Sequence, residues 1–227
     1  TLLKSQPQIC AIGADGEQLL QRLRQFPVLL EDRDYRNFVV AQGLAICARV
    51  SAPFYILYAQ KLMPLSGETI GTLSLAYLGA DTVTNLIWGH LGDKHGYRVS
   101  LIGVFMLWAC SIALLFFAWS PEAIVMAFFG LGAAASGYVL AAGTIVLEFG
   151  LREDVPMRLA FVTTVEGIVS TIGPIFAGLL IGAVGFGPLL GLSLGFILIS
   201  LMIMTFWVNE PRHRDRVEEM ASLSSYD

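Results

Sequence analysis

Three charged residues, Arg49, Asp81 and Glu166, lie deep inside segments of the sequence that are otherwise almost free of charge. At about 1.5 Å per helical residue, they lie roughly 18, 12 and 14 Å from the ends of their segments. A charge in the middle of a bilayer costs at least about 2.5–3.5 kcal/mol, so such residues usually face a cavity or pair with one another. Arg49 could therefore pair with Asp81 or with Glu166. The carboxylate left over could bind a proton or a cationic substrate.

The two carboxylates differ in their surroundings. For Asp81 a static ion pair that only holds helices together is the alternative to a functional role. Asp81, Asn85, Gly89 and Asp93 recur at every fourth position, so they share one face of a helix. We expect this face to meet another domain, which favours a gating or helix-pairing role for Asp81. Glu166 is the better candidate for contact with a proton or a substrate.

The segments that carry these residues are apolar and long enough to cross a membrane. Charged residues make up 14% of the chain and hydrophobic residues 56%, whereas a soluble domain contains about a quarter charged residues. Three uncharged segments cover residues 99–120, 123–147 and 186–208, and three with very few charges cover residues 37–60, 69–92 and 157–183. Each reaches the about 20 residues that a spanning helix needs. We predict an all-α membrane protein with six transmembrane helices.

Lysine and arginine residues are distributed unevenly between the two ends of these segments. Twelve of the 14 lie on the side of the amino-terminal leader, Lys61 lies in a loop on the other side, and Arg49 lies within a span. Loops rich in Lys and Arg stay in the cytoplasm. We predict a cell-membrane protein with both termini in the cytoplasm. Its predicted parts are a leader over residues 1–36, a six-helix transmembrane domain over 37–209 and a tail over 210–227.

The connection between the second and third predicted spans resembles a known motif. Residues 89–98 read GHLGDKHGYR, which fits the pattern G-x-L-x-D-x-x-G-x-R. The motif residues are Gly89, Leu91, Asp93, Gly96 and Arg98. This pattern resembles the signature loop of the major facilitator superfamily of secondary transporters. The resemblance implies one half of such a transporter, built from two inverted three-helix repeats, with the substrate bound between two halves.

The resemblance also implies what surrounds this half. The long leader is similar to the loop that joins the halves, so we expect a carboxyl-terminal half whose amino-terminal six-helix half is missing from the sequence. An amino-terminal half is the alternative. The chain starts without Met, which is typical of a fragment. In the family, the charged motif residues, here Asp93 and Arg98, belong to a cytoplasmic gate that opens as the halves rock.

Glycine and proline residues mark places where the helices should turn or bend. Gly89 is expected to end the second span and to let another helix approach closely, and Gly96 permits the positive φ of a tight turn. Gly173 and Pro174 resemble, incompletely, the Gly-Pro hinge motif of the family, with a kink of no special role as the alternative. Pro53 is expected to bend the first span.

The fourth span also has a candidate for substrate contact. The resemblance makes this span one of the helices that line the cavity, and Tyr138 could reach a substrate there. The glycines of this span suit close helix packing, with lining the cavity as their alternative.

The sequence disfavours an enzyme. Ser136 has small neighbours like those of an intramembrane protease, but the His residues lie at or outside the membrane boundary, so it has no general base. Cys10, Cys47 and Cys110 lack metal-ligand spacing, and no basic stripe suggests nucleic-acid binding. We expect no cofactor and no metal.

The expected partners are a small-molecule substrate, a proton or another coupling ion, and the lipid bilayer. The expected function is transport of that solute by alternating access. A non-transporting six-span scaffold or sensor is the alternative.

Overall fold

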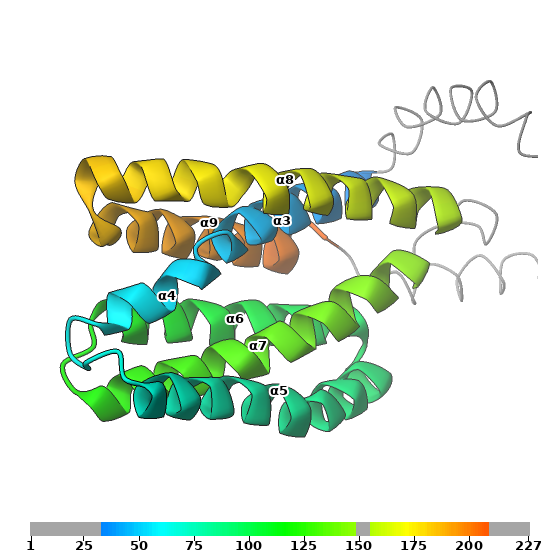
Figure 1. Cartoon of the computed structure of the whole chain (residues 1–227). Coiled ribbons are helices and arrows are strands. Elements are labelled where there is room, and N and C mark those ends of the chain that lie inside the picture. Colours follow the sequence, from blue (N-terminus) through cyan, green and yellow to red (C-terminus); the bar gives the residue numbers. More distant parts are fainter. Residues whose placement is uncertain (1–32, 149–154, 209–227) are drawn as a thin grey trace, which may run out of the picture.

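The fold is known from a computed structural model that describes residues 33–148 and 155–208, and this described part contains helices and no strand (Figure 1). The helices are α3 Arg33–Arg49, α4 Ala52–Ala59, α5 Gly67–His95, α6 Tyr97–Phe116, α7 Pro121–Glu148, α8 Val155–Val184 and α9 Phe186–Phe206. The all-helical prediction is thus confirmed for the described residues. Most of the predicted leader and the whole predicted tail lie outside them.

Five segments of the described chain are long and apolar enough to cross a membrane, namely residues 33–59, which combine α3 and α4, and helices α6, α7, α8 and α9. Helix α5 has 29 residues, but it is more polar because it carries Asp81, Asn85 and several threonines. The hydroxyls of Thr72, Thr82 and Thr84 donate to carbonyls one turn earlier, so these groups are satisfied inside the helix. A sixth span through α5 stays a prediction.

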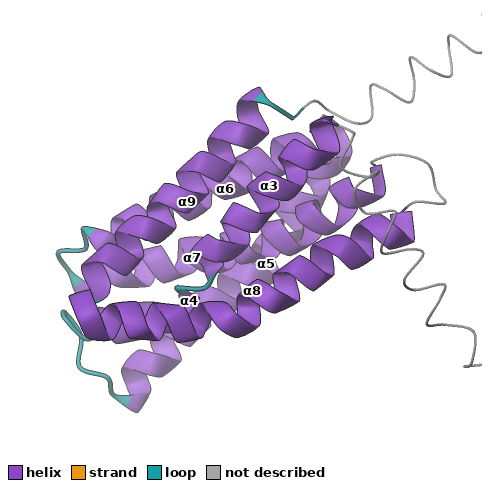
Figure 2. Ribbon diagram, turned by 90° about the horizontal axis from the view of Figure 1, so that it is seen from above, coloured by secondary structure: helices purple, strands orange, loops and turns teal. Residues whose placement is uncertain are grey.

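The helices form two groups (Figures 1 and 2). Helix α7 packs on α5 and α6 in one group, α3 packs on α9 with α8 beside them in the other, and α6 joins the groups through α9. The first group holds the consecutive helices α5, α6 and α7, and the second joins α3 to the late helices α8 and α9. The inverted repeats stay a prediction. Only 6% of the most apolar part of α8 is buried. Most of this helix is therefore open to lipid or to another domain.

The turn between α5 and α6 is a single residue, Gly96, whose φ of 93° belongs to the region that glycine favours. Helix α5 runs on to His95, so the prediction that Gly89 ends the second span is wrong. Lys94 and His95 can continue the helix because basic residues are favourable at its carboxyl end. A Cβ atom on Gly89 would meet Leu140 at 3.7 Å, an ordinary contact, so no close approach requires this glycine.

Arg98 caps the last helix. Its Nε donates to the carbonyl oxygen of Met204 at 3.3 Å, and its Nη2 donates to that of Thr205 at 2.8 Å. These carbonyls in the last turn of α9 have few partners within their own helix. The Asn37 amide donates to the carbonyl oxygen of Trp207 at 2.9 Å. The start of α3, the end of α9 and the α5–α6 turn therefore lie at one end of the bundle (Figure 1).

Close contact between α5 and α7 depends on Gly132. A Cβ atom at this position would collide with the carbonyl group of Tyr77. We therefore expect Gly132→Ala to lower the free energy of unfolding by about 1–3 kcal/mol, seen as a lower Tm in detergent. Gly143→Ala is the control, because nothing lies within 4 Å of its Cβ position. Equal losses of Tm in the two variants would contradict this account of the contact.

Candidate functional site

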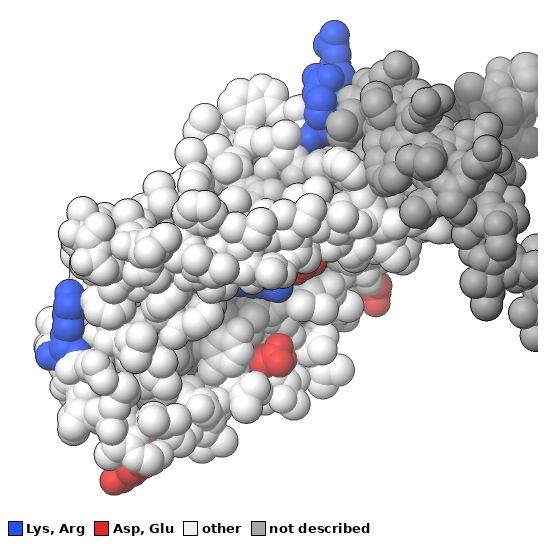
Figure 3. Space-filling model, turned by 45° about the horizontal axis from the view of Figure 1, so that its top comes forward, with Lys and Arg blue, Asp and Glu red and all other residues white. Residues whose placement is uncertain are grey.

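An ion pair joins the end of α3 to the middle of α8. Arg49 Nη2 lies 2.8 Å from Glu166 Oε1, and the two side chains are 36% and 30% exposed. Neither side chain is therefore fully buried by the described residues. Figure 3 shows blue and red atoms meeting in a hollow of a largely uncharged face. The sequence analysis left Asp81 and Glu166 as possible partners of Arg49. The structure pairs Arg49 with Glu166.

A buried tyrosine supports the guanidinium group. The Cζ atom of Arg49 lies 5.7 Å from the ring centroid of Tyr138, in cation–π geometry. The Tyr138 hydroxyl donates to the side-chain oxygen of Gln42, and these two residues are 4% and 2% exposed. The ring also packs edge-on against Trp108, with centroids 5.6 Å apart. Tyr138 is thus fixed in the core, where it can position Arg49, and its hydroxyl is already bonded within the fold.

The first span breaks immediately after Arg49. Pro53 has no N–H group to donate to the Arg49 carbonyl, so the helix cannot continue through this point. Ser51 is fully buried, and its Oγ lies 2.8 Å from the Ala48 carbonyl oxygen and 2.8 Å from Ser193 Oγ of α9. These hydroxyl contacts satisfy polar groups at the break and attach it to α9. The bend predicted from Pro53 is confirmed.

The predicted hinge of α8 lies against this break. A Cβ atom on Gly173 would collide with the Val50 side chain, so α8 approaches the break closely at this glycine. Pro174 lies inside α8, which continues as a helix on both sides. The break after Arg49 and the Gly173–Pro174 part of α8 therefore lie in contact. Bending at Gly173 and Pro174 during function stays a prediction.

A cavity of about 260 Å³ lies between the break, α5 and α8. It is lined by Ile46, Arg49, Val50, Ala52, Pro53, Tyr77, Ser170 and Pro174. We call this cavity the charged crevice. Tyr77 of α5 lines this cavity together with Arg49, and no ion pair joins Arg49 to Asp81 among the described residues. Asp81 is partly exposed and lies on the α5 side.

The motif residues lie elsewhere. Asp93 is 12 residues further along α5 than Asp81, a rise of roughly 18 Å. Its Oδ1 accepts a hydrogen bond of 2.8 Å from the Tyr97 hydroxyl, and Leu91 packs against the core. With Arg98 on the end of α9, the motif forms a separate site at one end of the bundle.

Sequence reasoning missed three uncharged polar residues: Tyr77 lines the charged crevice, Gln42 accepts a hydrogen bond from Tyr138, and Ser193 bonds to Ser51 at the break. Gln42, Tyr77 and Ser193 have no charge, so they do not stand out in an apolar segment. Their positions within predicted spans were the available signal, because an uncharged polar group in a membrane helix also needs a partner.

The sequence was also compared with known proteins. The family model of the Major Facilitator Superfamily matches residues 38–224. The chain belongs to this superfamily. The membership predicted from the motif is thus confirmed, and this major facilitator chain is a multi-pass membrane protein.

One relative of this major facilitator chain is Apicoplast pyruvate carrier 1 of Toxoplasma gondii. It is 30% identical over 162 residues, which cover 70% of the present chain and 25% of the relative. The aligned part is therefore about a quarter of the length of that relative.

Proposed function

We propose that this chain is a six-helix half of a transporter that moves a small solute across the cell membrane by alternating access, coupled to a proton. The observation that carries this proposal is the Arg49–Glu166 pair, which is partly exposed within apolar helices. Such charges are costly in a membrane and are typical of substrate or ion pathways.

Glu166 is the proposed proton carrier. Protonation removes its charge and weakens its pairing with Arg49, which frees the guanidinium group for a substrate anion. Arg binds a carboxylate through two parallel hydrogen bonds. The name of the relative, a pyruvate carrier, supports a small carboxylate as the first candidate substrate.

The proposed architecture follows the sequence prediction. Residues 37–209 form six spans with both termini cytoplasmic, residues 1–36 and 210–227 flank them, and an amino-terminal half completes the transporter. The exposed length of α8 and the exposed Asn85 and Asp93 on α5 are open to that half. Asp93 and Arg98 form the cytoplasmic gate, and Asp81 has a gating or helix-pairing role.

Counterflow in proteoliposomes tests the proposal. The protein that contains this chain is reconstituted with unlabelled pyruvate inside, and labelled pyruvate is added outside. We expect transient accumulation of the label, and a higher rate when the outside is more acidic. A scaffold or sensor would exchange neither pyruvate nor any other solute, and that result would refute transport.

A further inference from the structure

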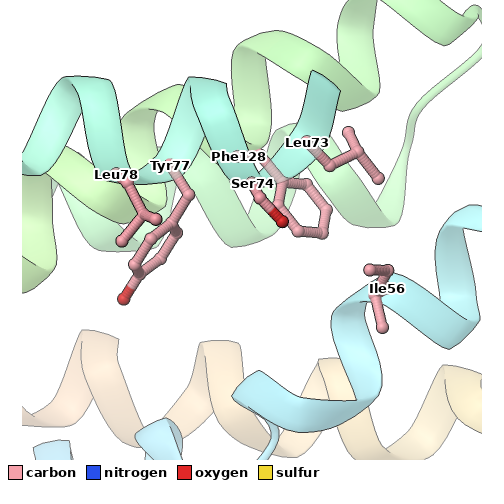
Figure 4. A pocket seen from close by; sticks show the side chains of 6 residues that line it. All are labelled: Ile56, Leu73, Ser74, Tyr77, Leu78 and Phe128. Atoms are coloured by element: carbon pink, nitrogen blue, oxygen red, sulfur yellow. The ribbon is translucent and has the colours of Figure 1, made fainter. Parts of the chain in front are cut away.

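A second cavity adjoins the charged crevice. It has a volume of about 230 Å³ and is lined by Ile56, Leu73, Ser74, Tyr77, Leu78 and Phe128. We call it the apolar pocket. Figure 4 shows Tyr77 and Leu78 on α5, across the pocket from Ile56 on α4. Four of its six lining residues have purely hydrocarbon side chains.

Tyr77 connects the two cavities. It lines both of them, and it shares the lining of the charged crevice with Arg49. On α4, Pro53 lines the charged crevice and Ile56 lines the apolar pocket, so the cavities follow one another along this helix. A ligand bound at Arg49 could therefore extend past Tyr77 into the apolar pocket.

Charge limits what can bind at Arg49. Arg49 is the one basic residue among those that line the two cavities. A ligand with one negative charge can take the place of Glu166 beside Arg49 without changing the net charge of that ion pair. A second carboxylate would be repelled by Glu166 and by Asp81 when these are ionised. Each cavity alone is smaller than the about 300 Å³ at which ligand pockets usually begin, which favours a small ligand with two unlike parts.

We propose that the two cavities together bind an amphipathic monocarboxylate, with its carboxylate on Arg49 and an aliphatic or aromatic tail in the apolar pocket. This inference rests on the proposed function and names its substrate class. Burial of the tail supplies affinity in proportion to the apolar surface removed from water. Longer acids should therefore bind more tightly than pyruvate-sized ones, until the pocket is filled.

Equilibrium binding to the purified protein in detergent tests this inference. The probes are propanoate, pentanoate, 4-methylpentanoate and 3-phenylpropanoate, each with its primary amide and the amine of equal length. We expect the acids to bind more tightly than the amides, with a gain of about fourfold for each buried methylene. Arg49→Gln should remove the preference for acid over amide.

Two matched variants locate the tail. Leu78 lines the apolar pocket and is 59% exposed, whereas Leu75 lies on the same helix outside it and is 74% exposed. Leu78→Ser should weaken binding of the longest acids by about fourfold or more, and Leu75→Ser should leave it within about twofold. Equal affinity along the acid series, or tighter binding of the amines, would overturn the inference. If tail length had no effect on affinity, counterflow of short acids would still support the transport proposal.

Discussion

Glu166→Gln is expected to reduce uptake driven by a pH gradient by about 5- to 150-fold, the usual range for loss of one coupling interaction. Glutamine has nearly the same shape and keeps an acceptor oxygen for Arg49, but it cannot take up and release a proton. Counterflow without a pH gradient should continue, because exchange of solute needs no net proton movement. The measurement is labelled solute uptake in proteoliposomes at several external pH values.

Asp81→Asn is the matched control for this prediction. Asp81 is also a carboxylate within a predicted span, but it forms no ion pair with Arg49 in the described structure. We expect this variant to keep the dependence of uptake on the pH gradient. If uptake by Glu166→Gln still depended fully on the pH gradient and uptake by Asp81→Asn did not, Asp81 would be the proton carrier. That result would contradict our assignment. The folded state of Glu166→Gln should lose at most about 1 kcal/mol of stability, since partly exposed ion pairs contribute little.

Gly173→Ala is expected to slow transport by up to about 100-fold, as small displacements of a reacting group can do. The added Cβ atom would collide with Val50, at the break that follows Arg49. The break would have to shift, and the guanidinium group would shift with it. Val50→Ala in the same protein makes room, and we expect the double variant to regain most of the transport rate.

Two neighbouring glycines on α8 supply controls for this effect. Nothing lies within 4 Å of a Cβ atom on Gly167, and one on Gly178 would meet only Phe54, at 3.9 Å. Alanine at either position should leave the transport rate near that of the unchanged protein. Transport lost equally in all three alanine variants, or no rescue by Val50→Ala, would show that contact with the break is not the cause.

Much of the local structure was predictable from the sequence. Long uncharged runs predict the helices α6, α7 and α9, because a helix that crosses a bilayer consists predominantly of apolar residues. The positive φ of Gly96 and the break near Pro53 follow from the conformational limits of glycine and proline. The rarity of charges within the spans drew attention to Arg49 and Glu166, which the structure joins in an ion pair; their role in a functional site stays a prediction.

Contacts between distant residues were not predictable in the same way. Depth along a helix did not decide whether Arg49 pairs with Asp81 or Glu166, because that depends on how α3, α5 and α8 pack. The capping of α9 by Arg98 joins residues more than 100 positions apart, and no local pattern specifies it. The end of α5 was misplaced because Gly89 is tolerated within a helix whose last turn is basic.

Proton uptake on ligand binding tests the central claim most directly. A carboxylate that binds tightly is added to the purified protein in weakly buffered detergent solution, and the change in pH is recorded. If the ligand replaces Glu166 on Arg49 and Glu166 binds the coupling proton, as proposed above, each binding event should take up about one proton. Glu166→Gln should bind the ligand with no proton uptake. Binding to the unchanged protein without proton uptake, or equal uptake in Glu166→Gln, would contradict the account.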